Sequence, residues 1–120
     1  MKKKYIPTIA VGVFVLFLAC AISPIVHKVR TRQIYNAIAT AGEQYQSKSP
    51  SIESASEFSK KLHSIKTGYA PAEVKQAVSD YIIAWDSCLV VQRAGRDAKV
   101  YNQAVEENKL KLGAVLNANQ

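Results

Sequence analysis

The sequence predicts an all-α protein in which a single N-terminal transmembrane or signal helix precedes a small bundle of about four helices. An uncharged and mostly apolar stretch, Tyr5–Val26, is long enough to cross the hydrocarbon core of a bilayer, which takes about 20 residues. After this stretch, apolar residues recur at spacings of three and four, which is typical of helices. The 120 residues show no strand-like alternation of apolar and polar side chains.

Basic residues gather on both sides of the uncharged stretch. Lys2–Lys4 precede it, and Lys28, Arg30 and Arg32 follow it, whereas residues 33–120 hold ten Lys or Arg against nine Asp or Glu. The net charge of +7 therefore belongs mainly to the boundary of the predicted membrane segment. This distribution suits anionic lipid headgroups and argues against nucleic acid as a partner.

Three fates are open to residues 1–32, the first of two predicted domains. A retained anchor explains why apolar residues continue to Val26, directly before the basic cluster, and it is the interpretation that we favour. A signal peptide would be cleaved near Ala21, after the small residues Ala19–Ala21. A lipoprotein would be cleaved before Cys20 and acylated there, but the residues ahead of Cys20 match a lipobox only loosely.

The Lys and Arg residues on the two sides of the uncharged stretch are nearly balanced, and their balance sets the orientation of a membrane helix. A short tail before a first apolar segment usually stays in the cytoplasm. We therefore expect residues 33–120, the second domain, to lie outside the cytoplasm, in the periplasm of a host with two membranes. Signal cleavage would instead release this domain as a secreted or periplasmic protein.

The first helix of the bundle is predicted over residues 29–46, with one apolar stripe made of Ile34, Ile38, Ala41 and Tyr45. Ala37, Ala39 and Gly42 make this helix slim enough for a neighbour to approach closely. The polar segment Ser47–Ser51, which contains a proline, ends it.

A second helix is predicted from Ser54, because Ser54 and Glu57 have the spacing of a capping box. Thr67 and Gly68 are expected to end this helix, since glycine adopts the left-handed conformation of a C-terminal cap at low cost.

The third predicted helix has Pro71 at its first position and runs to about Gln92. Its apolar stripe contains the candidate residues for packing or partner contact, which are Tyr81, Trp85 and Leu89. Tyr81 and Trp85 lie one turn apart, an arrangement that suits stacking on the core or on a partner.

A hairpin is predicted to join the third helix to the fourth, which covers residues 98–116. The apolar pattern falters after Gln92, and Gly95 and Asp97 supply a helix stop and an N-cap. One long continuous helix is the alternative. Asn108 interrupts the apolar stripe of the fourth helix, which weakens the prediction that this helix is buried.

No group of residues in the sequence predicts catalysis, a cofactor or a metal site. His63 is the single histidine of the second domain, and Lys66 and Thr67 occupy the helical positions where a second metal ligand would be needed. Cys88 is interpreted as a small buried hydrophobe, and a hydrolase that uses Cys88 with His63 is the third hypothesis. The carboxylates of Glu106 and Glu107 are expected to be solvated.

Two functional hypotheses from different classes remain. The first is a membrane-tethered, extracytoplasmic helical module that binds another protein or a second copy of itself, as accessory or assembly factors do. Its expected partners are the lipid bilayer and a protein. The alternative is a cleaved, exported helical protein that binds a small apolar ligand between its helices. The sequence predicts neither an enzyme nor a nucleic-acid-binding protein.

Overall fold

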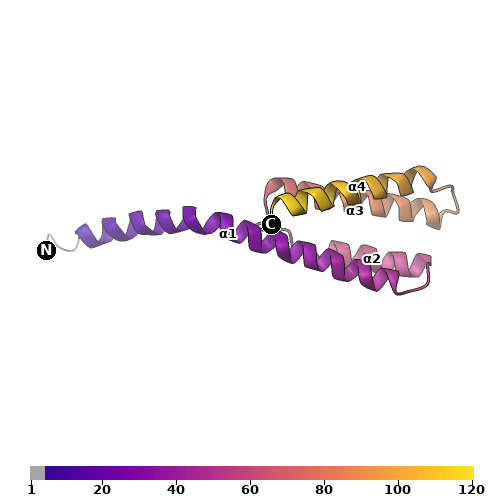
Figure 1. Ribbon diagram of the computed structural model, residues 1–120, viewed down its shortest axis with the longest axis horizontal. Coiled ribbons are helices and arrows are strands. Elements are labelled where there is room, and N and C mark those ends of the chain that lie inside the picture. Colours follow the sequence, from indigo (N-terminus) through magenta and orange to yellow (C-terminus); the bar gives the residue numbers. More distant parts are fainter. Residues whose placement is uncertain (1–4) are drawn as a thin grey trace.

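The computed structural model describes the backbone of residues 5–120 and the side chains of residues 24–120. Its elements, shown in Figure 1, are the helices α1 (Tyr5–Gln46), α2 (Ile52–His63), α3 (Ala72–Arg93) and α4 (Lys99–Ala118). The prediction of an all-α bundle is confirmed for this part of the chain. The predicted first helix of the bundle forms the C-terminal part of α1, which continues through Pro24.

The uncharged stretch Tyr5–Val26 of the predicted anchor lies almost entirely outside the described side chains, because only its last three residues belong to residues 24–120. The two predicted cleavage positions, at Cys20 and Ala21, also lie outside them. Among the side chains that are described, no helix offers an apolar stretch long enough to cross a membrane.

The helices form two antiparallel pairs (Figure 1). The C-terminal part of α1 lies beside α2, and α3 lies beside α4. The contact between α3 and α4 is the most extensive contact between helices. Helix α2 also packs on α3, and this contact holds the two pairs together. Helix α1 contacts α4 only slightly. The bundle therefore has one open side, between α1 and α4.

The core is continuous through all four helices. Its most deeply buried apolar side chains are Ile34 of α1, Leu62 of α2 and Val74 of α3, each at most 1% exposed. Val105, Leu112 and Leu116 bring α4 into the same core. The stripe predicted for the first helix faces inward, with Ile34 and Ala41 buried and Ile38 and Tyr45 partly buried.

The predicted capping box of the second helix is wrong by three residues. Ser51 is the N-cap of α2, its Oγ accepts the Ser54 N–H at 3.0 Å, and the Ser54 Oγ accepts the Ser51 N–H at 3.1 Å. Serine satisfies the reciprocal position here in place of the usual Glu or Gln. The Glu57 carboxylate instead pairs with Lys48, which holds the pKa of Glu57 below its usual value.

The end of the second helix is also earlier than predicted, at His63, with Ser64 as its C-cap. The left-handed residue of the following connection is Tyr69 (φ 67°) and not Gly68. The reason is a turn in which the Ala70 N–H donates to the Thr67 carbonyl oxygen at 3.1 Å. This turn buries Ala70 in the core and leaves the Tyr69 side chain 71% exposed.

The remaining helix ends differ from the predictions by only one or two residues. Helix α3 begins at Ala72, so Pro71 is its N-cap and not its first residue. Gly95 follows α3 with a left-handed φ of 68°, which confirms the hairpin. The N-cap of α4 is Ala98 and not Asp97, although the Asp97 Oδ1 still accepts the Lys99 N–H at 3.0 Å.

The left-handed conformation of Tyr69 predicts that Tyr69→Gly stabilises the protein. A non-glycine residue in this region costs about 1 kcal/mol, and glycine does not carry this cost. We expect the free energy of unfolding, measured with urea, to rise by roughly 0.5–1 kcal/mol in the glycine variant. Tyr69→Ala is the control, because it removes the ring and keeps the strain. An equal gain in both variants would contradict the explanation.

Candidate functional site

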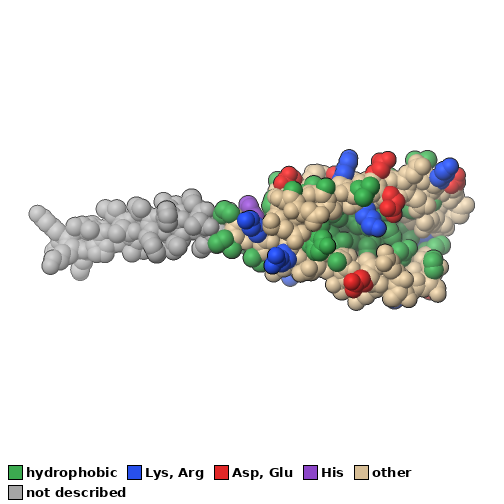
Figure 2. Space-filling view, in the orientation of Figure 1, with side chains coloured by type: hydrophobic (Ala, Val, Ile, Leu, Met, Phe, Trp, Pro, Cys, Tyr) green, Lys and Arg blue, Asp and Glu red, His purple; other side chains and the backbone are tan. Residues whose placement is uncertain are grey.

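An apolar groove runs along the open side of the bundle, and its cavity volume is about 540 Å³. Residues 35–46 of α1 and 105–116 of α4 form its walls, and side chains of α2 and α3 form its floor. Figure 2 shows hydrophobic side chains gathered in the hollow between the two ridges of the bundle. Each wall covers about three helical turns, or roughly 16 Å at 1.5 Å per residue. We call this feature the α1–α4 groove.

The floor of the α1–α4 groove is aromatic. Phe58, Tyr81 and Trp85 line it, together with Tyr45 from the α1 wall. The ring centroids of Phe58 and Trp85 are 4.6 Å apart. The ring centroid of Tyr45 lies 5.3 Å from that of Phe58 and 5.4 Å from that of Trp85. The Trp85 Nε1–H donates to the Ala55 carbonyl oxygen at 3.1 Å. This bond fixes the indole between the core and the groove.

The floor of the groove carries no charge at neutral pH. Burial raises the pKa of Tyr81 to about 12, and the Glu106 carboxylate adds to this rise. The phenol of Tyr81 is therefore neutral over the whole physiological range. The charged lining residues, Glu43, Glu106 and Lys109, come from the two walls. An apolar surface with polar groups at its border is typical of binding sites.

The walls of the groove contain three small residues, Ala39 and Gly42 on α1 and Gly113 on α4. The sequence suggested that α1 is slim enough for a close neighbour, but the structure leaves space beside this part of it. A Cβ atom built at Gly42 or at Gly113 would meet no other heavy atom within 4 Å. Glycine at these two positions therefore serves no contact within the described part of the chain.

The three candidate residues from the sequence are divided between the groove and a neighbouring cavity. Tyr81 and Trp85 line the α1–α4 groove, and Tyr81 is only 5% exposed. Leu89 is also buried and lines a smaller cavity of about 270 Å³ together with Trp85 and Cys88. Sequence reasoning missed the contribution of α4, because Asn108 interrupts its apolar stripe between Val105 and Leu112.

A polar cluster joins α2 to α3 on the outside of the bundle. The Asp86 Oδ1 accepts a hydrogen bond from the Ser59 Oγ at 2.6 Å, and the Asp86 Oδ2 lies 2.6 Å from the His63 Nε2. The carboxylate thus stands between the serine and the histidine, whereas nucleophilic catalysis needs these two groups in direct contact. Residues 24–120 contain no group of three side chains that would hold a metal ion.

Cys88 is buried, at 6% exposure, and its thiol donates to the Asn102 Oδ1 of α4 at 3.0 Å. Burial raises the pKa of Cys88, which lowers the fraction of the reactive thiolate at any given pH. His63 forms its hydrogen bond with Asp86 instead. Cys88 and His63 are therefore held by different partners and make no hydrogen bond with each other in the described structure.

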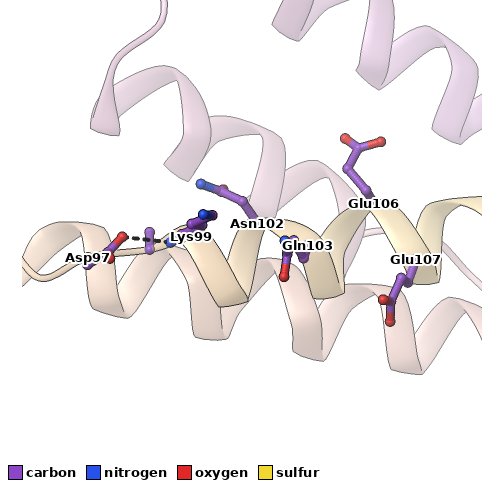
Figure 3. Close-up of a pocket in the computed structure, with 7 residues that line it drawn as sticks. Asp97, Lys99, Asn102, Gln103, Glu106 and Glu107 are labelled. Atoms are coloured by element: carbon purple, nitrogen blue, oxygen red, sulfur yellow. Dashed lines mark hydrogen bonds between the residues drawn. The ribbon is translucent and has the colours of Figure 1, made fainter.

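A shallow hollow lies along the first half of α4, and Figure 3 shows the side chains around it. Its lining residues all belong to α4 or to the two positions before it, so it lacks the opposing wall that a binding site needs. The carboxylates of Glu106 and Glu107 point to opposite sides of the helix (Figure 3). They are not positioned as a catalytic pair.

Comparisons with known proteins give no relative for this chain, because no protein-family model matches it, no curated protein matches it significantly and no solved structure matches its fold significantly.

The environment of Cys88 predicts a thiol that is hard to label. In a Cys20→Ala background Cys88 is the single thiol, and we expect iodoacetamide at pH 8 to modify it at least about a hundredfold more slowly than the urea-unfolded chain, since access requires local opening. The control is Ile83→Cys with both native cysteines replaced by alanine, because Ile83 is 60% exposed on the same helix. A native Cys88 rate equal to the control rate would contradict the burial of the thiol.

Proposed function

We propose that this protein is a membrane-tethered helical binding module whose α1–α4 groove receives an amphipathic helix of a protein partner. The observation that carries the proposal is an apolar, aromatic-floored groove about three helical turns long, on a chain whose uncharged stretch Tyr5–Val26 is flanked by basic residues. The tether and the extracytoplasmic location rest on that sequence pattern.

The dimensions of the groove favour a helix as its occupant. A helix about 10 Å wide and 16 Å long, sunk to half its depth, fills roughly 600 Å³. The cavity volume of the groove is about 540 Å³. A partner helix would lay its apolar face on Phe58 and Trp85, and its polar residues would meet Glu43, Glu106 and Lys109 at the walls.

A small apolar ligand is the second candidate occupant, and the volume of the groove favours it as well. Pockets for small molecules measure about 300–1,000 Å³ and are mostly apolar with a few polar groups. The groove meets both conditions. A second copy of this chain would be a further protein occupant, since its amphipathic helices have the required pattern.

Photo-crosslinking in native membranes separates these occupants. A photoreactive phenylalanine analogue replaces Tyr35 of α1 or Lys109 of α4 in the full-length chain, because both residues are exposed and line the groove. Ile83, which is 60% exposed on α3, receives the same analogue as the matched control. We expect one discrete protein adduct from both groove positions and at least tenfold less of it from the control position. The reason is that a helix bound in the groove contacts the groove positions and not Ile83.

The mass of the adduct identifies the class of occupant. A partner-sized increase supports a different protein, a doubled mass supports self-association, and an increase of less than about 1 kDa supports a small ligand, since drug-sized molecules fill such pockets. Gly42→Leu should reduce the adduct formed from Tyr35, because a leucine fills the groove, and Gly42→Ala should leave it unchanged. Equal adducts from groove and control positions would overturn the proposal.

A further inference from the structure

A second cleft, between α1 and α2, differs from the groove in its charge. Its cavity volume is about 530 Å³, and its basic lining residues are Arg30 of α1, Lys61 of α2 and Lys66 just after α2. Neutral polar side chains, including Gln33, Asn36 and Ser64, complete much of the lining, and no acidic side chain takes part in it. We call this feature the basic cleft.

The three cations of the basic cleft are not neutralised by carboxylates. Among the described side chains, the carboxylates of Glu57 and Asp86 contact Lys48 and His63, and neither contact includes a residue of the cleft. The Lys61 ammonium donates to the Gln44 amide oxygen, which is a neutral partner. The charge of Lys61 also contributes to the lowered pKa of Glu57, but the direct ion-pair partner of that carboxylate is Lys48.

This combination of side chains matches the chemistry of a phosphate group. A guanidinium presents a planar fork of N–H donors that binds two phosphate oxygens at once, and ammonium groups add point charges. The Arg30 guanidinium and the Lys61 and Lys66 ammonium groups come from both sides of the cleft. We propose that the basic cleft binds a phosphate group.

The position of the cleft favours a lipid headgroup as the source of that phosphate, and this step rests on the proposed tether. Arg30 follows Val26, the last residue of the uncharged stretch, by four positions, or about 6 Å along a helix. The headgroup layer of each leaflet is roughly 5–7 Å thick. The α2–α3 connection, with its exposed Tyr69, lies at the same end of the bundle (Figure 1), and tyrosine is common at this depth.

Binding is tested on the full-length chain in nonionic detergent micelles, with inorganic phosphate and short-chain dihexanoyl phosphatidylglycerol as separate ligands. Arg30→Gln and Lys66→Gln each remove one cation from the cleft. Lys99→Gln is the matched control, because it removes the same charge at the hairpin end of the bundle, outside the cleft. Arg30→Lys keeps the charge and loses the planar fork. Circular dichroism of each variant checks that the helices are retained.

We expect Arg30→Gln and Lys66→Gln each to weaken binding about tenfold or more, the usual loss of one charge-assisted hydrogen bond. Lys99→Gln should bind like the wild type, and Arg30→Lys should fall between wild type and Arg30→Gln. Phosphatidylglycerol binding at least tenfold tighter than inorganic phosphate would assign the site to a lipid headgroup. Similar affinities would assign it to a free phosphate, and the site itself would stand.

Absence of binding for both ligands would overturn the proposal, and so would an equal loss in Lys99→Gln and Arg30→Gln, which would indicate only a general effect of charge. The result does not depend on the α1–α4 groove, because the two cavities share no lining residue. Failure of the crosslinking experiment at Tyr35 and Lys109 would thus leave this test intact.

Discussion

Three aromatic rings, one from each of α1, α2 and α3, pack against one another beneath the α1–α4 groove. The Tyr45, Phe58 and Trp85 ring centroids are separated by 4.6–5.4 Å, and each such pair contributes about 0.5–1.5 kcal/mol beyond its buried area. The cluster holds α1 against the rest of the bundle, although α1 makes little contact with α4. The open side, and therefore the groove, exists because the rings join three helices while α4 packs chiefly on α3.

Helix types and approximate positions were predictable from the sequence, because they follow from apolar periodicity and from Gly and Pro signals. The hairpin after α3 is an example, since Gly95 takes the left-handed conformation expected of it. Helix ends were less predictable. Ser51 competes with Ser54 for the cap, and a tertiary preference for burying Ala70 places Tyr69, not Gly68, in the left-handed region.

The candidate site was predictable only in part. Periodicity identified Tyr81 and Trp85 as prominent side chains of α3, but it does not predict which neighbouring helices leave these side chains uncovered. The contact between His63 and Asp86 likewise joins residues that are 23 positions apart, so helical spacing around His63 gives no sign of it. The basic cleft combines Arg30 with Lys61 and Lys66 across two helices, and it requires the packing of α1 on α2.

Helix α1 forms a wall of both cavities, the apolar groove on one side and the basic cleft on another. A helix that leads from the uncharged stretch into the bundle would place the basic cleft near lipid headgroups and extend the groove away from them. Under the proposed tether, lipid contact would fix the orientation of the bundle, and this orientation would present the groove to the proposed partner. The basic cleft and the α1–α4 groove would then be consecutive parts of one tethered binding module.

The most direct test of the open groove is acrylamide quenching of Trp85, which is the single tryptophan of the chain. In purified full-length protein in lipid nanodiscs, we expect quenching between that of a buried indole and that of the urea-unfolded chain, because Trp85 is partly buried and lines the groove. Gly42→Leu, which fills the groove, should reduce the quenching, and Gly42→Ala should not. A wild-type Trp85 as shielded as a fully buried indole, and unaffected by Gly42→Leu, would contradict an open α1–α4 groove.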